Sequence, residues 1–302
     1  MFTKIVVPLD GSAQANAALP LVRTFARATG AAVTLVRVKS EAESRGEVTA
    51  QLSRVAEELA GSGLQVHSVV REGEPADEIL DEMKVQGADL VIMRTHGRSG
   101  LGRAVLGSVS ERVLKASGVP VVLLRPGGRR VSHLGTLLVP VDGSPGGAVA
   151  LGTAIGLSKS TGAALRLVEV VVPIPNYVYS SFAMDGAMYV DPAWDAEAQA
   201  AAQTYVDSLT SRLRAADVDA TGDVVIAASV AETIVKAADD RNADLIVMSS
   251  QALTGVARAL LGSVSDAVVR ASHCPVLVIH RPPNVAETST PLQAPAAANG
   301  KR

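Results

Sequence analysis

The stretch IVVPLDGS at Ile5–Ser12 returns as LLVPVDGS at Leu137–Ser144, an offset of 132 residues. A second pair of segments, ADLVIM at Ala88–Met93 and ADLIVM at Ala243–Met248, is offset by 155 residues. Two halves that contain the same segments in the same order indicate an internal duplication. The two offsets differ by 23 residues, which predicts an insertion of that length in the second half.

A glycine-rich stretch follows the second of these segments in each half. RTHGRSGLGRAVLGSVSERVL at Arg94–Leu114 returns as SSQALTGVARALLGSVSDAVV at Ser249–Val269, with nine of the 21 positions identical. Glycines between a strand and a helix are typical of an anion site, because backbone N–H groups there approach a ligand closely. The stretch lacks the G-x-G-x-x-G order of a dinucleotide fingerprint and the lysine of a P-loop, which argues against fast phosphoryl transfer.

The chain length suits two domains. Its 302 residues, 48% of them hydrophobic, are ordinary for a globular protein of two units. The residues after Pro282 show no periodicity, which predicts disorder. The predicted division is a first domain at 1–126, a linker at 127–135, a second domain at 136–282 with the insertion near 172–196, and a disordered tail at 283–302.

Charge and cysteine content exclude several classes of protein. The formal net charge is −2 and the pI is near 6.2, without the basic excess that usually accompanies nucleic-acid or membrane-surface partners. The N-terminus has no signal-peptide pattern and no segment approaches a membrane span. The single cysteine, Cys274, favours a reducing compartment. We therefore expect a cytoplasmic protein with neither a nucleic-acid nor a membrane partner.

Apolar strands alternate with helices through each half. In the first half, strands are expected at 4–9, 32–38, 65–72, 89–93 and 120–125, and helices at 13–29, at 47–59, from Pro75, and at 108–116. Near-continuous runs of Val, Leu and Ile between helices indicate a parallel sheet covered on both faces. The predicted fold class is therefore α/β, with two tandem doubly wound domains.

Polar residues follow the strands where a ligand is expected. In a doubly wound sheet, ligands bind beyond the carboxyl ends of the strands. Asp10 and Asp142 follow the first strand of each half, and the glycine-rich stretches follow the fourth, so both features should face one crevice. Each Asp either accepts a hydrogen bond from an adenine or ribose group or caps the next helix, and the two roles are compatible. The hydroxyls of Ser108 and Ser110 and the N-terminus of their helix are expected to donate to a phosphate.

Together these motifs resemble the universal stress protein family in its tandem form. The resemblance rests on V-P-L-D-G-S after the first strand and on T-H-G, nine residues and G-S-V-S after the fourth, and it extends to about Pro282. It implies a five-stranded parallel sheet of order 3-2-1-4-5 in each half. It also implies an adenine-nucleotide ligand, ATP or AMP, with or without Mg²⁺.

The chain departs from the nucleotide signature of that family, which reads G-x-x-G, nine residues, G and then Ser or Thr. Gly97, Gly107 and Ser108 match the signature, whereas Arg94 stands at its first glycine. The corresponding second-half residues are, in order, Ser249, Ala252, Gly262 and Ser263. Because two glycines are replaced in the second half and one in the first, the first half is the better candidate for nucleotide binding.

Two kinds of residue have alternative interpretations. Arg94 either fills the space of a ribose or phosphate, or pairs with the phosphates through its guanidinium. Val38 and Val170, at the ends of the second strands, contact adenine by resemblance or are ordinary sheet core. The full set of candidate binding residues is Pro8, Asp10, Gly11, Ser12, Val38, Arg94, Thr95, Gly97, Gly107, Ser108, Val109 and Ser110 in the first half, and Asp142, Gly143, Ser144, Val170, Gly262, Ser263, Val264 and Ser265 in the second.

The predicted insertion is rich in aromatic side chains. It contains Tyr177, Tyr179, Phe182, Tyr189 and Trp194, five of the eight aromatic residues of the chain. The insertion is either a lid or partner-binding surface near the crevice, or a long loop folded over its own hydrophobic patch.

The leading hypothesis is a nucleotide-binding regulatory module of the stress response without an efficient catalytic centre. No metal-ligand spacing and no nucleophile elbow is recognisable in the sequence, although slow ATP hydrolysis stays open. The alternative is a nucleotide-free interaction protein with degenerate motifs. The resemblance also implies self-association through the last strands, PVVLLR and PVLVIH, either between the two halves or in a homodimer. The sequence does not identify a protein partner.

Overall fold

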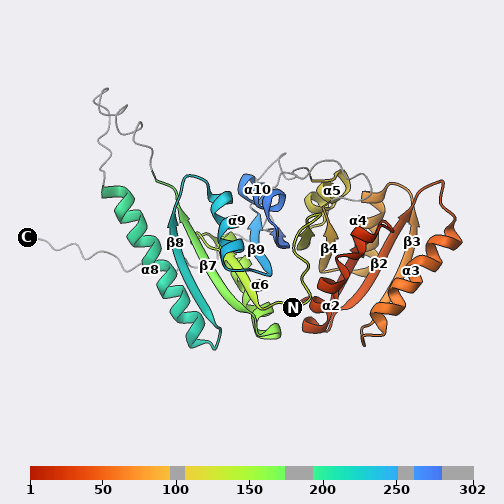
Figure 1. The fold of residues 1–302 in the computed structure, drawn as a ribbon, viewed down its shortest axis with the longest axis horizontal. Helices are drawn as coiled ribbons and strands as arrows, with labels where there is room; N and C mark the ends of the chain where they lie inside the picture. The colour runs from red at the N-terminus through yellow and green to blue at the C-terminus, as the bar shows by residue number, and fades with distance from the viewer. Residues whose placement is uncertain (96–105, 174–192, 251–261, 281–302) are drawn as a thin grey trace, which may run out of the picture.

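The computed structural model describes residues 1–95, 106–173, 193–250 and 262–280, which form two similar halves on either side of a central join (Figure 1). The first half consists of β1 (Lys4–Pro8), α1 (Ala13–Asn16), α2 (Leu19–Thr29), β2 (Ala32–Lys39), α3 (Arg45–Ala60), β3 (Val66–Glu72), α4 (Pro75–Gln86), β4 (Leu90–Arg94), α5 (Ser108–Ala116) and β5 (Val121–Leu124). The second half consists of β6 (Thr136–Pro140), α6 (Pro145–Thr161), β7 (Ala164–Val171), α8 (Ala193–Ala215), β8 (Ala220–Ile226), α9 (Val230–Asp240), β9 (Leu245–Ser250), α10 (Ser263–Ala271) and β10 (Val276–His280).

The strand order of each half is the one that the resemblance implies. It is β3-β2-β1-β4-β5 in the first half and β8-β7-β6-β9-β10 in the second. All strand pairs within a half are parallel. The fold-class prediction is therefore confirmed, and the carboxyl ends of β1 and β4 lie side by side as a crevice between them requires.

The two halves share one continuous sheet of ten strands. At the join, β5 pairs with β10 in antiparallel orientation, with Leu123 opposite Val276 and Val121 opposite Val278. On their other edges β5 pairs with β4 and β10 pairs with β9. Neither last strand keeps a free edge, so the last strands associate between the two halves of the chain rather than with a second chain.

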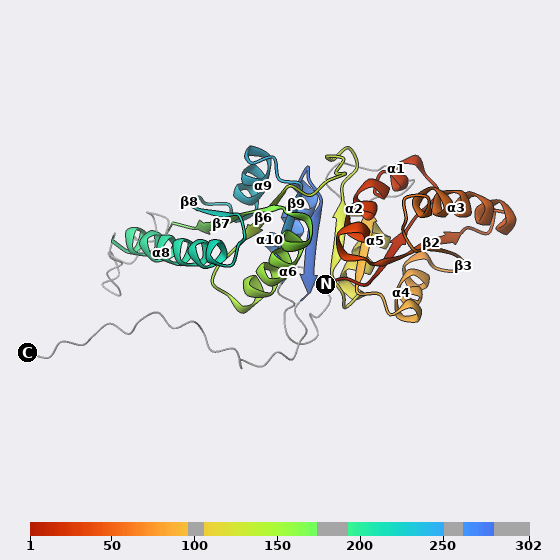
Figure 2. The same ribbon diagram turned by 90° about the horizontal axis from the view of Figure 1, so that it is seen from below.

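Helices cover both faces of this sheet (Figure 2). One core layer contains side chains of α2, α3, α6 and α8, and the other contains side chains of α4, α5, α9 and α10. Each layer draws residues from both halves, and α2 contacts α6 across the join. Burial of this apolar surface, worth about 25 cal/mol per Å², therefore stabilises the join as well as each half.

The segment between β5 and β6 is packed rather than free. Val131 and Leu134 are only 2% and 1% exposed. The backbone N–H of Arg129 donates to the carbonyl of His273 at 2.6 Å. The Asp244 carboxylate accepts two backbone N–H groups at and just before the start of β6. This connection therefore fixes the two halves relative to each other through buried contacts.

The prediction of a single helix over 13–29 is wrong. These residues form two helices, and the shorter, α1, ends at Asn16. Pro20 lies in the first turn of α2. It has no N–H to donate to the carbonyl of Asn16, and its ring would clash with that carbonyl in one continuous helix. The equivalent helix α6 has its proline, Pro145, at the first position, where a helix tolerates it, and continues for 17 residues.

Several predictions fall outside the described residues. They concern Gly97, Ala252, nearly all of the aromatic insertion, and the tail after Pro282. In the ranges that the structure does describe, no helix is both long enough and apolar enough to cross a bilayer.

Candidate functional site

A cavity opens at the carboxyl ends of β1, β2 and β4. We call it the first-half cavity; it encloses about 350 Å³, within the usual range for a small-molecule site. Its lining residues are Pro8, Leu9, Asp10, Ala15, Val36, Val38, Pro75, Ile79, Met93, Arg94, Thr95, Gly107, Ser108, Val109 and Ser110. Nine of the candidate binding residues are among them, whereas Gly11 and Ser12 are not.

One wall of the first-half cavity is apolar. Val36 and Val38 lie on one face of β2, because alternate residues of a strand share a face. Ile79 in α4 and Met93 in β4, which are 4% and 5% exposed, complete the wall. Neither Ile79 nor Met93 is among the candidate binding residues predicted from the sequence. Val91 and Met93 are two residues apart in β4 and pack in the same core layer. This spacing could have identified Met93 from the sequence. Only the tertiary structure places α4 over β2.

Asp10 holds a turn with one oxygen and keeps the other without a partner. Its Oδ1 accepts the backbone N–H of Ser12 at 2.9 Å and the hydroxyl of Ser12 at 2.6 Å. Ser12 in turn accepts the N–H of Ala15, so the serine rather than the aspartate caps the next helix. The Oδ2 of Asp10 is buried and has no hydrogen-bond partner in the described chain. Because buried polar atoms are nearly always paired, this oxygen is available to a donor on a ligand.

Helix α5 begins at the cavity with unused backbone donors. Its N-cap residue is Gly107, at φ −65° and ψ 147°, and no side chain caps the helix. The N–H groups of Ser108, Val109 and Ser110 therefore lack an acceptor within the helix, and they lie at the positive end of its dipole. Helices α6 and α9, by contrast, each have a serine side chain as a cap. The start of α5 thus presents donors suited to an anion.

Ser110 has a structural hydrogen bond rather than a free hydroxyl. Its Oγ donates to the carbonyl of Thr95 at 2.7 Å, and the side chain is 2% exposed. The N–H of Gly107 donates to the same carbonyl at 2.7 Å. These two bonds tie the start of α5 to the end of β4. The hydroxyl of Ser108 is therefore the one left for a ligand, a difference from the expectation that both serine hydroxyls donate to a phosphate.

Arg94 borders the first-half cavity without filling it. Its side chain lines both this cavity and a second pocket at the join of the two halves. Its Nε is buried without a hydrogen-bond partner among the described residues. Burial lowers the pKa of Arg94, the charge of Asp10 opposes this shift, and the charge of Arg130 adds to it. The guanidinium therefore lies between an acidic and a basic neighbour, with donor capacity unused.

The second half repeats the turn that follows the first strand. Asp142 Oδ1 accepts the N–H of Ser144 at 3.0 Å, and Ser144 accepts the N–H of Gly147 at 3.1 Å. Gly143, like Gly11, has a left-handed φ, at 69° against 78°. Asp142 is exposed, however, whereas Asp10 is half-buried.

The second half also repeats the connection from strand to helix. Helix α10 begins at Ser263, after Gly262, without a side-chain cap. The hydroxyl of Ser265 donates to the carbonyl of Ser249 at 3.2 Å, one residue before the counterpart of Thr95, to which Ser110 donates in the first half. The remaining candidate residues, Val170 and Val264, pack partly buried against the core. The two halves thus share a backbone framework at this end of the sheet.

The halves differ in charge on the opposite face of the sheet. Glu169 in β7 stands where β2 has Arg37, which pairs with Glu43 at 2.5 Å. Burial raises the pKa of Glu169, the charge of Asp142 raises it further, and Oε2 is buried without a hydrogen-bond partner in the described residues. This reversal of charge was not predicted, although an alignment of β2 with β7 shows it in the sequence.

The described residues include neither a cluster of metal ligands nor an exposed thiol. Within the part of the chain that the structure describes, no three His, Cys, Asp or Glu side chains gather as a metal site requires. Cys274 is buried, and burial raises the pKa of its thiol, as expected of a structural cysteine.

The chain is similar to universal stress proteins along nearly its whole length. The model of the universal stress protein family matches residues 1–125 and 134–280. Universal stress protein Rv2005c of Mycobacterium tuberculosis is 27% identical over 305 residues, an alignment that covers 91% of this chain and 96% of that protein. Universal stress protein YxiE of Bacillus subtilis is 32% identical over 148 residues, 41% of this chain and 100% of that protein. A solved universal stress protein from Archaeoglobus fulgidus is 21% identical, with a TM-score of 0.71 over 92% of this chain and 98% of that one, and shares the fold.

Proposed function

The chain belongs to the universal stress protein family and contains the family's domain twice, and from this premise we propose that its first half binds an adenine nucleotide as a regulatory module. The proposed ligand is AMP or ATP, with Mg²⁺ accompanying ATP. The apolar wall of Val36, Val38 and Ile79 would contact the base. The start of α5 would receive the phosphates.

One observation supports this proposal above the others. A single cavity of about 350 Å³ is lined by the uncapped start of α5 and by Asp10, whose buried Oδ2 has no partner in the described chain. The helix terminus suits phosphate oxygens, and the unpaired oxygen of Asp10 suits an N–H or O–H donor of a base or ribose. A nucleotide offers both kinds of group in one molecule.

We propose binding rather than rapid catalysis. No lysine is among the described residues that line the first-half cavity, and the glycine-rich stretch lacks the P-loop lysine that contacts the β- and γ-phosphates. In the proposed role, a protein partner recognises the nucleotide-bound state of the first half. The single, buried cysteine favours the cytoplasm as the place where this happens.

The test compares the same substitution in the two halves. Gly107→Asp and Gly262→Asp change residues with nearly the same backbone, at φ −65° and −59° and ψ 147° and 145°. Neither glycine has a positive φ, and Asp is a favourable N-cap residue, so both variants should fold. An aspartate at position 107 puts a negative charge beside the proposed phosphate site, whereas one at 262 does so in the other half.

The measurement is isothermal titration of the nucleotide-free chain with Mg-ATP and with AMP. We expect binding by the parent chain, at least tenfold weaker binding by Gly107→Asp, and binding within about twofold of the parent by Gly262→Asp. Equal losses in the two variants would contradict the assignment to the first half. Absence of any binding by the parent chain, with no nucleotide released on its denaturation, would refute nucleotide binding and favour an interaction protein with degenerate motifs.

A further inference from the structure

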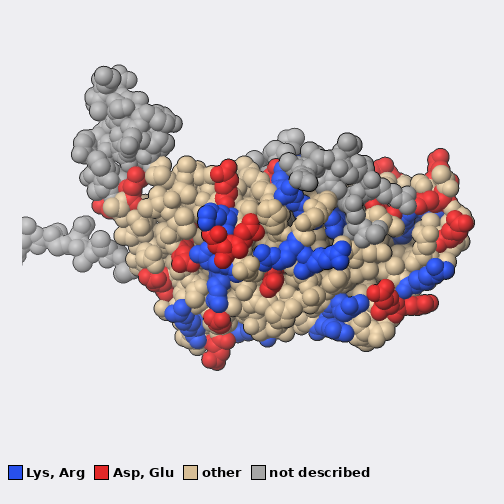
Figure 3. Space-filling view, viewed as in Figure 1, with Lys and Arg blue, Asp and Glu red and all other residues tan. Residues whose placement is uncertain are grey.

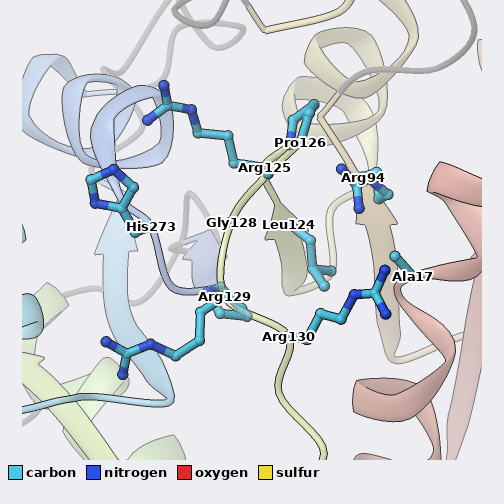
Figure 4. Close-up of a pocket in the computed structure, with 11 residues that line it drawn as sticks. Ala17, Arg94, Leu124, Arg125, Pro126, Gly128, Arg129, Arg130 and His273 are labelled. Atoms are coloured by element: carbon cyan, nitrogen blue, oxygen red, sulfur yellow. The ribbon is translucent and has the colours of Figure 1, made fainter.

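A second pocket lies where the two halves meet, and no sequence motif pointed to it. We call it the junction pocket; it encloses about 300 Å³. Figure 4 shows the segment after β5 passing through it, with His273 on one side and Arg94 on the other. Its lining residues are Ala17, Arg94, Leu124, Arg125, Pro126, Gly127, Gly128, Arg129, Arg130, His273 and Pro275.

The described residues that line the junction pocket include several basic side chains and no carboxylate. Among the eleven lining residues that the structure describes, four are arginines and one is a histidine, and none is Asp or Glu. In Figure 3, Lys and Arg side chains gather across the middle of the molecule, where the halves join. The net charge of the whole chain is −2, so this concentration of positive charge is a local feature. Clefts lined by one sign of charge raise the local concentration of ligands of opposite sign.

Two of the arginines are fixed in place by the second half. Arg125 Nη1 donates to the carbonyl of Ala271 at 2.9 Å, and Arg129 Nη1 donates to the carbonyl of Ala243 at 3.0 Å. Each bond uses one of the five N–H donors of a guanidinium. Because the acceptor is a neutral carbonyl, the bond does not compensate the positive charge of the arginine. A fixed guanidinium loses less conformational freedom when it binds an anion.

The other two arginines lie on the same side of the junction pocket and have unused donors. Figure 4 shows the guanidinium of Arg130 extending toward Ala17, on the same side as Arg94. Arg130 is exposed and has no hydrogen bond or ion pair within the described ranges, and Arg94 Nε is buried without a partner. Two acidic groups act on lining residues: Asp10 attracts Arg94 from the first-half cavity, and the carboxylate of Asp239 lies 3.1 Å from His273. Neither lines the junction pocket.

Gathering like charges in a partly enclosed space is unfavourable unless an anion compensates them. The planar donor fork of a guanidinium matches the oxygens of a phosphate group. We propose that the junction pocket binds a phosphate-bearing anion between Arg130 and Arg94, with Arg125 and Arg129 adding positive charge. This site shares Arg94 with the first-half cavity but is otherwise lined by different residues, and the inference holds whether or not a nucleotide binds in that cavity.

The test uses inorganic tripolyphosphate as the probe, because it has phosphate groups and no base. The full chain is titrated calorimetrically with tripolyphosphate, alongside the variants Arg130→Gln and Arg54→Gln. Both substitutions remove one exposed positive charge, but Arg54 lies on α3, away from the pocket. Circular dichroism melting verifies that each variant is folded.

We expect saturable binding of one tripolyphosphate per chain. Arg130→Gln should weaken it roughly tenfold or more, the loss of one charge-assisted hydrogen bond, and Arg54→Gln by no more than about twofold. Absence of saturable binding, or equal weakening by the two variants, would overturn the proposal, because binding would then reflect total charge alone.

Competition identifies the source of the phosphate. If ATP displaces tripolyphosphate and adenosine does not, the site receives the phosphates of a nucleotide. If neither ATP nor adenosine displaces tripolyphosphate, the site binds a free anion. Either of these two results supports the proposed anion site in the junction pocket. Loss of ATP binding in Gly107→Asp with tripolyphosphate binding intact would show that the two sites are separate.

Discussion

Replacing Arg94 by Gln should weaken the binding of ATP and of AMP and leave the binding of adenosine nearly unchanged. The substitution keeps much of the side-chain length and removes the positive charge. Arg94 lines the first-half cavity together with the uncapped start of α5, where the phosphates are proposed to bind. The cavity is open while the arginine is in place, so the side chain borders the space and does not obstruct it.

The expected magnitude follows from one charge-assisted hydrogen bond. Such a bond contributes about 1.5–3 kcal/mol, and about 1.4 kcal/mol corresponds to a factor of ten, so the dissociation constant should rise roughly 10- to 150-fold. The charge of Asp10 already partly compensates the guanidinium. We therefore expect a loss near the lower end of this range for both nucleotides.

The assay is isothermal titration at moderate salt with ATP, AMP and adenosine in turn. Arg54→Gln serves as the control for total charge, and a melting curve shows whether loss of the cation beside Asp10 has destabilised the fold. Tighter nucleotide binding by Arg94→Gln would refute this reasoning and show that the arginine obstructs the site. An equal loss for adenosine would assign the effect to the cavity wall and not to a phosphate contact.

Two further comparisons test the packing near the turns after the first strands. Glu169→Gln should raise the melting temperature at about pH 8 and leave it unchanged at about pH 4, below the ordinary pKa of 4.5. Burial and Asp142 raise the pKa of Glu169 in the fold, so the native state is penalised as pH rises through that pKa; an equal effect at both pH values would contradict this. Gly11→Ala should destabilise the chain to urea more than Gly143→Ala does, and equal losses would be inconsistent with the structure. Both glycines have a left-handed φ, costing an alanine about 1–2 kcal/mol, but only at Gly11 would the new Cβ lie 2.8 Å from Arg37 Nη1, with nothing within 4 Å at Gly143.

Much of the fold is determined by local sequence patterns. Runs such as Ile5–Val7 and Leu90–Met93 are buried strands in any compact arrangement, and glycines with positive φ after β1 and β6 require the turns that follow. The duplication then predicts the second half from the first. Even the one wrong helix had a local signal, because Pro20 breaks it for a reason visible in the sequence.

The sequence by itself therefore determined two repeats of a doubly wound sheet and the end of that sheet where a ligand belongs. Only the tertiary structure decided that β5 pairs antiparallel with β10, that the Ser110 hydroxyl bonds to the Thr95 carbonyl, and that Arg94 borders two pockets. The physical reason is the distance along the chain over which each interaction acts. Strand and turn preferences arise from each residue and its near neighbours, whereas the direction of a side chain and the charges around it depend on segments that meet only after folding.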